Sequence, residues 1–117
     1  MSKPAVYKIA DHYKGDTFDG VQFTILNSSD SLPINLTDCT IKIQFRKNTN
    51  NGNIVKEITQ VDGITITDAV NGVFKIDPFL INWDEGNYYY DIQITFTDNA
   101  VRTYIKGTLA IIQDITF

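Results

Sequence analysis

The clearest pattern in this chain runs from residue 88 to residue 96, where large and polar side chains alternate without a break. The even positions hold Tyr88, Tyr90, Ile92, Ile94 and Phe96, and the odd positions hold Tyr89, Asp91, Gln93 and Thr95. Successive side chains of a β-strand point to opposite faces of the sheet. The pattern therefore predicts a strand whose even-numbered side chains are buried and whose odd-numbered side chains face water.

The rest of the chain predicts shorter strands separated by turns. Alternation or a mixed strand pattern is expected at residues 5–9, 21–25, 39–45 and 54–61. Clusters of Asp, Asn, Ser, Thr and Gly predict turns at residues 11–15, 27–31 and 48–53. Pro33 favours an edge or a crossover over a central strand. A brief helical turn is expected only at residues 77–83.

This spacing of strands and turns predicts the fold class. It is typical of an all-β, immunoglobulin-like antiparallel β-sandwich of about seven to nine strands. With 117 residues, the chain is expected to form a single domain, residues 1–117, with a flexible N-terminus at residues 1–4.

The lead-in to the long strand, Asp84-x-Gly86-x-Tyr88, has the spacing of a tyrosine corner, in which the phenol bonds back to the chain entering the strand. Tyr90 stands where antibody domains carry their second cysteine. Cys39 is the only cysteine, so an internal disulfide is excluded and a reducing cytoplasm suits the chain. Cys39 falls on the same face of its predicted strand as the core residues, which predicts a buried, inert thiol.

The hairpin at Val70-Asn71-Gly72 allows two registers. A two-residue turn would place Ile66 opposite Asp77, whereas a three-residue loop with Gly72 left-handed places Ile66 opposite Ile76 and Ile64 opposite Pro78. Burial favours the three-residue loop.

In the last hairpin, Asp98 and Asn99 are expected to form the turn. The inner pairs are then Phe96 with Val101, Ile94 with Thr103, Ile92 with Ile105, Tyr90 with Gly107 and Tyr88 with Leu109. On the outer face, Asp91 meets Lys106 and Gln93 meets Tyr104. Since a glycine inside a strand weakens the ladder unless an aromatic ring covers it, Tyr90 is expected to cover Gly107.

Charge narrows the range of partners. The net charge is −4, and no basic run is longer than Arg46-Lys47. Nucleic acid and anionic membranes are therefore not expected as partners. The N-terminal residues lack the apolar run of a signal peptide, and no apolar stretch is long enough to span a membrane.

Candidate catalytic and metal-binding residues are few. His12, the only histidine, has Asp11 and Asp16 nearby, but a surface-loop histidine is the simpler interpretation. Loop carboxylates at Asp62, Asp68 and Asp84 lack the regular spacing of a calcium motif. Asp84 and Glu85 are adjacent, which is poor geometry for a paired general acid and base, and Asp84 is expected to cap the corner. No enzyme activity, cofactor or metal is expected.

Two routes to a binding function remain. Tyr89 and Tyr104 are expected on the outer face, where with Gln93 and Lys106 they form a candidate contact face; aromatic rings there could stack on a sugar. Edge strands of a sandwich expose unpaired backbone groups, so partners or neighbouring copies can pair with them.

The order of several short motifs resembles the N-terminal domain family of phage baseplate upper proteins, over about residues 7–112. The motifs are Lys14-Gly15-Asp16-Thr17-Phe18, Pro33-Ile34-Asn35-Leu36-Thr37, Asn71-Gly72-Val73-Phe74, Gly86-Asn87-Tyr88-Tyr89-Tyr90 and the closing strand through Gly107. Each motif is weak alone, and only their order and spacing carry the resemblance.

The resemblance implies a non-enzymatic, immunoglobulin-like module that attaches a larger component to a phage or prophage tail baseplate. Its partners would be other tail or baseplate proteins, with a homo-oligomer in the assembly, and the chain would reside in the virion after synthesis in the host cytoplasm. Family members usually continue into further regions, which leaves open whether this is an excised domain or a self-contained protein. The alternative is a carbohydrate-binding or adhesion sandwich of a bacterial surface system. The positions expected to determine the fold are Gly15, Asp16, Gly72, Asp84, Gly86, Tyr88, Tyr90 and Gly107.

Overall fold

The computed structural model describes residues 5–27, 29–47 and 53–112. The N-terminus expected to be flexible, residues 1–4, and residues 48–52 of the expected turn lie outside the described residues.

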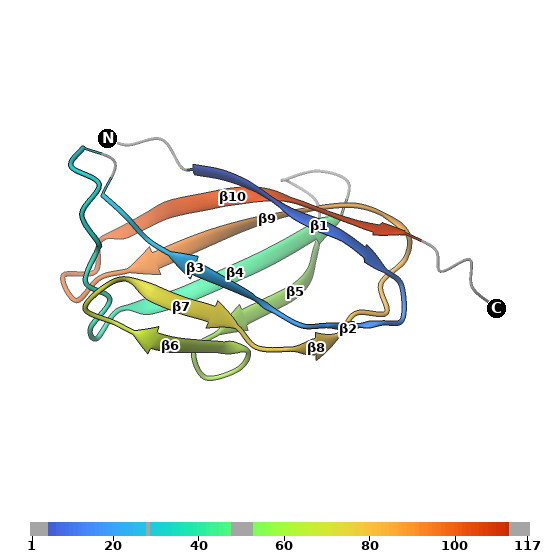
Figure 1. The fold of residues 1–117 in the computed structure, drawn as a ribbon, viewed down its shortest axis with the longest axis horizontal. Helices are drawn as coiled ribbons and strands as arrows, with labels where there is room; N and C mark the ends of the chain where they lie inside the picture. Colours follow the sequence, from blue (N-terminus) through green and yellow to red (C-terminus); the bar gives the residue numbers. More distant parts are fainter. Residues whose placement is uncertain (1–4, 28, 48–52, 113–117) are drawn as a thin grey trace.

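Within the described residues the chain forms ten β-strands and no helix (Figure 1). They are β1 (Ala5–Tyr13), β2 (Thr17–Phe18), β3 (Val21–Thr24), β4 (Thr40–Lys47), β5 (Ile54–Thr59), β6 (Ile64–Asp68), β7 (Val73–Ile76), β8 (Phe79–Leu80), β9 (Gly86–Thr95) and β10 (Val101–Ile112). A five-stranded sheet has the order β1-β10-β9-β4-β5, a three-stranded sheet the order β3-β7-β6, and β2 pairs with β8. The predicted immunoglobulin-like β-sandwich is confirmed.

One hydrophobic core contains buried side chains from both of the larger sheets. The even-numbered side chains of β9 from Tyr88 to Ile94 are buried, as predicted, and Phe96 just after the strand is half-buried against the core. From the three-stranded sheet, the rings of Phe23 and Phe74 stack with centroids 5.6 Å apart. Full burial of one large apolar side chain contributes about 1.5–3 kcal/mol. The row of buried side chains on β9 is therefore a main source of the stability of the domain.

Strand β1 pairs in parallel with β10 and is longer than the sequence predicts. The expected turn at residues 11–15 begins later, because His12 and Tyr13 still pair with Ile111 and Ile112. The register of this pairing shifts between Ile9 and His12. Pairing with β10 therefore overrides the local turn signal.

The predicted register of the β6–β7 hairpin is wrong. Ile64 faces Ile76 and Ile66 faces Phe74, with a shift between Ile66 and Asp68. The turn is longer than expected: the Gly72 N–H donates to the Ala69 carbonyl at 3.1 Å. Gly72 does take the predicted left-handed backbone, with φ +73°. The bulge that changes the register cannot be recognised from the alternation of apolar and polar residues in the sequence.

The β9–β10 register is correct from Ile92–Ile105 to Tyr88–Leu109 and wrong nearer the turn, where Arg102 faces Ile94. Asn99 is left-handed with φ 70°, and the Phe96 N–H donates to the Ala100 carbonyl at 2.9 Å. A three-residue loop thus replaces the expected turn of Asp98 and Asn99. The bulge between Thr103 and Ile105 then restores the predicted register.

The helical turn expected at residues 77–83 does not form. Phe79 and Leu80 instead make β8, in which they pair with Phe18 and Thr17. The Phe18 and Phe79 rings also meet edge to face, with centroids 5.6 Å apart. Pairing with β2 satisfies backbone groups of β8 in an extended conformation, so this segment does not need the hydrogen bonds of a helix. Pro33 forms only an isolated bridge with Leu26, which agrees with its expected place outside a central strand.

Candidate contact surfaces

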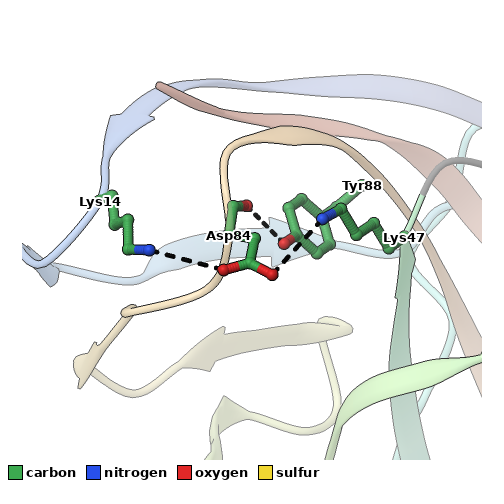
Figure 2. A network of polar contacts seen from close by, with 4 residues as sticks. All are labelled: Lys14, Lys47, Asp84 and Tyr88. Atoms are coloured by element: carbon green, nitrogen blue, oxygen red, sulfur yellow. Dashed lines mark hydrogen bonds and ion pairs between the residues drawn. The ribbon is translucent and has the colours of Figure 1, made fainter. Parts of the chain in front are cut away.

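The tyrosine corner is present. The Tyr88 hydroxyl donates to the Asp84 backbone carbonyl at 2.5 Å, as Figure 2 shows. Tyr88 is 1% exposed. Burial, and secondarily the charge of Asp84, raises the pKa of the Tyr88 phenol above its ordinary value. The phenol therefore stays protonated and holds the chain that enters β9.

The Asp84 carboxylate forms two ion pairs beside the same corner. Its oxygens lie 3.5 Å from Lys14 Nζ and 3.8 Å from Lys47 Nζ (Figure 2). The Asp84 side chain is 80% exposed, so each ion pair is screened by solvent and adds little stability. The two pairs nevertheless draw together the ends of β1 and β4. Asp84 thus caps the corner as expected.

Gly15 and Asp16 act through their backbone. The Gly15 N–H donates to the Ile81 carbonyl at 2.8 Å, and the Asp16 N–H donates to the Tyr13 carbonyl at 3.2 Å. Gly15 has φ +90°, and Gly86 opens β9 opposite Ile111 with φ 143°. These contacts close the turn after β1 and tie it to the loop before the corner.

Tyr90 and Gly107 face each other as predicted, and the structure adds a third member to the pair. A Cβ on Gly107 would lie only 1.7 Å from the Tyr7 backbone oxygen and 2.9 Å from the Tyr90 hydroxyl. The Tyr90 hydroxyl donates to that same Tyr7 oxygen at 2.6 Å. Burial, and secondarily Tyr7, raises the pKa of the Tyr90 phenol. Gly107 therefore lets β1 come close enough for Tyr90 to anchor it.

The predicted contact face is only partly assembled. Tyr89 and Gln93 are half-buried, and Lys106 is exposed opposite Asp91. Gln93 faces Thr103, so its predicted pairing with Tyr104 is wrong. Tyr104 lies at the β10 bulge and packs edge-on against Phe96, with centroids 6.2 Å apart. The two tyrosines do not form the expected pair on one open face.

Sequence reasoning assigned Asp91 to the solvated face and missed its environment. Its Oδ1 atom is shielded from solvent and has no hydrogen-bond partner in the structure described here. Burial raises the pKa of the Asp91 carboxyl, while the charges of Arg46 and Lys42 oppose the rise. Alternation alone could not reveal this, because the neighbours of Asp91 in the sheet, Gln44 on β4 and Lys106 on β10, come from distant parts of the chain.

Gln60 and Cys39 meet at the start of β4. Gln60 was also missed: its Nε2 donates to the Cys39 carbonyl at 2.6 Å, and its Oε1 accepts from the Ile41 N–H at 2.8 Å. A side-chain amide thus satisfies two backbone groups of the strand. Cys39 is buried as predicted, and burial, aided by the Asp38 charge, raises the pKa of its thiol. A raised pKa disfavours the reactive thiolate.

An open groove of about 380 Å³ lies between β1 and the segment formed by β2 and the start of β3. Residues 7, 9–13 and 16–21 line it. His12 lies in strand β1 and not in the expected loop; its Nε2 donates to the Asp16 carbonyl at 2.8 Å, and its ring meets Phe18 edge-on. A carbonyl can only accept, so this contact requires the Nε2–H form of the imidazole.

No set of three or more His, Cys, Asp and Glu side chains is placed to hold a metal ion within residues 5–27, 29–47 and 53–112. In the same residues, no helix has the length and apolarity needed to cross a membrane.

No protein-family model matches the chain, and no curated protein matches it. Among solved structures, it is similar to CopC from Methylosinus trichosporium OB3b, with 11% identity, 92% of this chain and 91% of that chain covered, and a TM-score of 0.45. It is also similar to extracellular domains 3–5 of Drosophila OTK, with 19% identity, 97% of this chain and 34% of that chain covered, and a TM-score of 0.36. Both similarities concern the fold.

Proposed function

We propose that this chain is a non-enzymatic attachment module of a phage or prophage tail baseplate, which acts through contacts with other tail proteins. Two lines support the proposal. One is the resemblance of its ordered motifs to baseplate upper protein N-terminal domains. The other is that the polar side chains that could have taken part in catalysis form hydrogen bonds and ion pairs within the domain.

The second line is the observation that carries the proposal. Tyr88, Tyr90 and His12 each donate to a backbone carbonyl within the domain. The Asp84 carboxylate pairs with two lysines of the same domain. These groups hold the sandwich together, and in the part of the chain that the structure describes, sheet faces and sheet edges are available for contacts. Such surfaces suit protein contacts.

The rival function, carbohydrate binding, requires an open aromatic platform. Of the two tyrosines considered for that platform, Tyr104 packs against Phe96 and the core. We therefore favour the attachment role. A glycan array with the parent chain and the Tyr89→Ala and Tyr104→Ala variants separates the two: attachment predicts no binding, and tyrosine-dependent binding supports the rival.

Fractionation of a lysate from the producing cell tests the tail assignment itself. After prophage induction, tail particles are separated on a density gradient and each fraction is assayed for this chain by quantitative mass spectrometry. The proposal predicts a peak that follows the tail proteins and moves with them when heads are removed. A chain found only among free proteins or in the cell-envelope fraction would contradict it.

A further inference from the structure

The groove beside β1 is bordered by two sheet edges. Strand β1 ends the five-stranded sheet and β3 ends the three-stranded sheet, so each has one side with no neighbouring strand in the described part of the chain. An edge strand presents backbone N–H and C=O groups that an added strand can satisfy. This groove is therefore a place where an extended segment could pair with the backbone.

Much of β1 is accessible to such a segment. Tyr7 and Tyr13 are each 46% exposed, and both line the groove. The strand does not depend on a new partner for its own position, since β10 and the Tyr90–Tyr7 hydrogen bond already hold it. The free edge is thus a preformed template that needs little ordering before it binds.

The charges that line the groove indicate the charge of a partner that would bind there. Its lining contains three carboxylates, Asp11, Asp16 and Asp19, and one histidine, with no Lys or Arg. Lys8 lies 3.8 Å from Asp11, but both side chains are more than half exposed, so Asp11 is only weakly neutralised. Lys14 is directed instead to Asp84. The groove is therefore acidic and complementary to a basic segment.

The same charges disfavour a second copy of this chain, which carries a net charge of −4. A register shift between Ile9 and His12 also interrupts the regular edge, and bulges and charged residues are devices that protect edges from indiscriminate pairing. The acidic lining therefore disfavours a strand of like charge and favours a strand of opposite charge.

We propose that the groove between β1 and the β2–β3 segment is a docking site for an extended basic segment of a partner protein, which adds as a strand to the free edge of β1. The inference rests on the proposed contact role but not on the tail assignment. Particle fractionation and the binding measurement below can therefore fail separately.

The test is a titration of the ¹⁵N-labelled chain with three short peptides, followed by NMR. One peptide alternates lysine and valine, a second has the same charge but a central proline, and a third replaces every lysine by glutamate. Proline cannot donate to a ladder, so the second peptide separates strand pairing from simple charge attraction. The first peptide should bind at least about tenfold more tightly than the other two, with shifts in the amides of β1 and residues 16–21.

Charge-reversal variants locate the site. Asp16→Lys with Asp19→Lys should weaken the lysine–valine peptide about tenfold or more, whereas the control Asp62→Lys, an exposed residue between β5 and β6, should leave binding unchanged. The two substituted residues are exposed, and Asp16 takes part in three hydrogen bonds of the fold, all of them through its backbone. The proposal is overturned by any of four results: no binding, equal binding of the proline peptide, shifts outside this groove, or concentration-dependent shifts without peptide, which would assign the groove to a second copy.

Discussion

Substitution of Gly107 by alanine tests how β1 is attached to the sandwich. The added Cβ would lie 1.7 Å from the Tyr7 carbonyl oxygen, whereas real Cβ atoms essentially never approach within 3.0 Å. The nearest atom belongs to backbone, so a rotamer change cannot relieve the clash. Strand β1 must move away from β10, or β10 must bend.

Either movement costs free energy in two ways. Overpacking of this kind costs about 1–3 kcal/mol, and loss of the Tyr90–Tyr7 hydrogen bond costs about 0.5–1.5 kcal/mol more. We expect Gly107→Ala to lower the free energy of unfolding by about 2–4 kcal/mol, unless β1 detaches first and limits the loss. A small domain has only about 5–15 kcal/mol in total, so the change is large.

Urea unfolding followed by circular dichroism measures the loss, and hydrogen exchange locates it. Amides of β1 should lose protection before those of β4 and β9. Thr108→Ala, the adjacent residue on the same strand, is the matched control and should change stability little. Tyr90→Phe should cost about 1 kcal/mol, and the double variant should cost less than the two single changes added together, because both act on the Tyr7 carbonyl. Parental stability and β1 protection in Gly107→Ala would refute this account of the strand.

Three further predictions concern single side chains. Tyr88→Phe should lower the free energy of unfolding by about 1 kcal/mol in urea titrations, and equal midpoints would refute a stabilising corner bond. The raised pKa of Asp91 means that the folded state binds the proton more tightly, so the parent loses stability as pH rises through the titration of this group. The free energy of unfolding of Asp91→Asn relative to the parent should therefore increase from about pH 3 to about pH 7, and a constant or opposite difference would contradict the shielding of Asp91. Cys39 should react with a thiol reagent only after urea unfolds the chain; fast labelling of the native protein would show that the thiol is accessible.

Sequence alone was enough for the features that depend on side-chain parity or on a fixed motif. The buried face of β9 follows from strict alternation, the corner follows from the spacing of Asp84 and Tyr88, and the burial of Cys39 follows from its parity with β4. The facing of Tyr90 and Gly107 was also predicted, because a strand glycine needs cover. All of these are local properties of one strand or one pair.

Features that depend on a third segment were missed. The close approach of Tyr7 to Gly107 requires the parallel docking of β1, which the alternation within one strand does not specify. The registers of both hairpins changed at bulges, where the period of two is interrupted without a distinctive residue. The groove beside β1 arises from two segments joined by a turn, and its acidic lining becomes apparent only when they lie together.

Localisation of the chain on intact particles is the most direct test of its role as an attachment module. Antibodies against the folded domain, coupled to gold, are applied to purified tail particles from the producing strain and viewed by electron microscopy, with particles from a deletion strain as the control. The account predicts gold at the tail tip, absent from the deletion strain. Unlabelled tail tips, with the chain recovered instead on the bacterial surface, would contradict it.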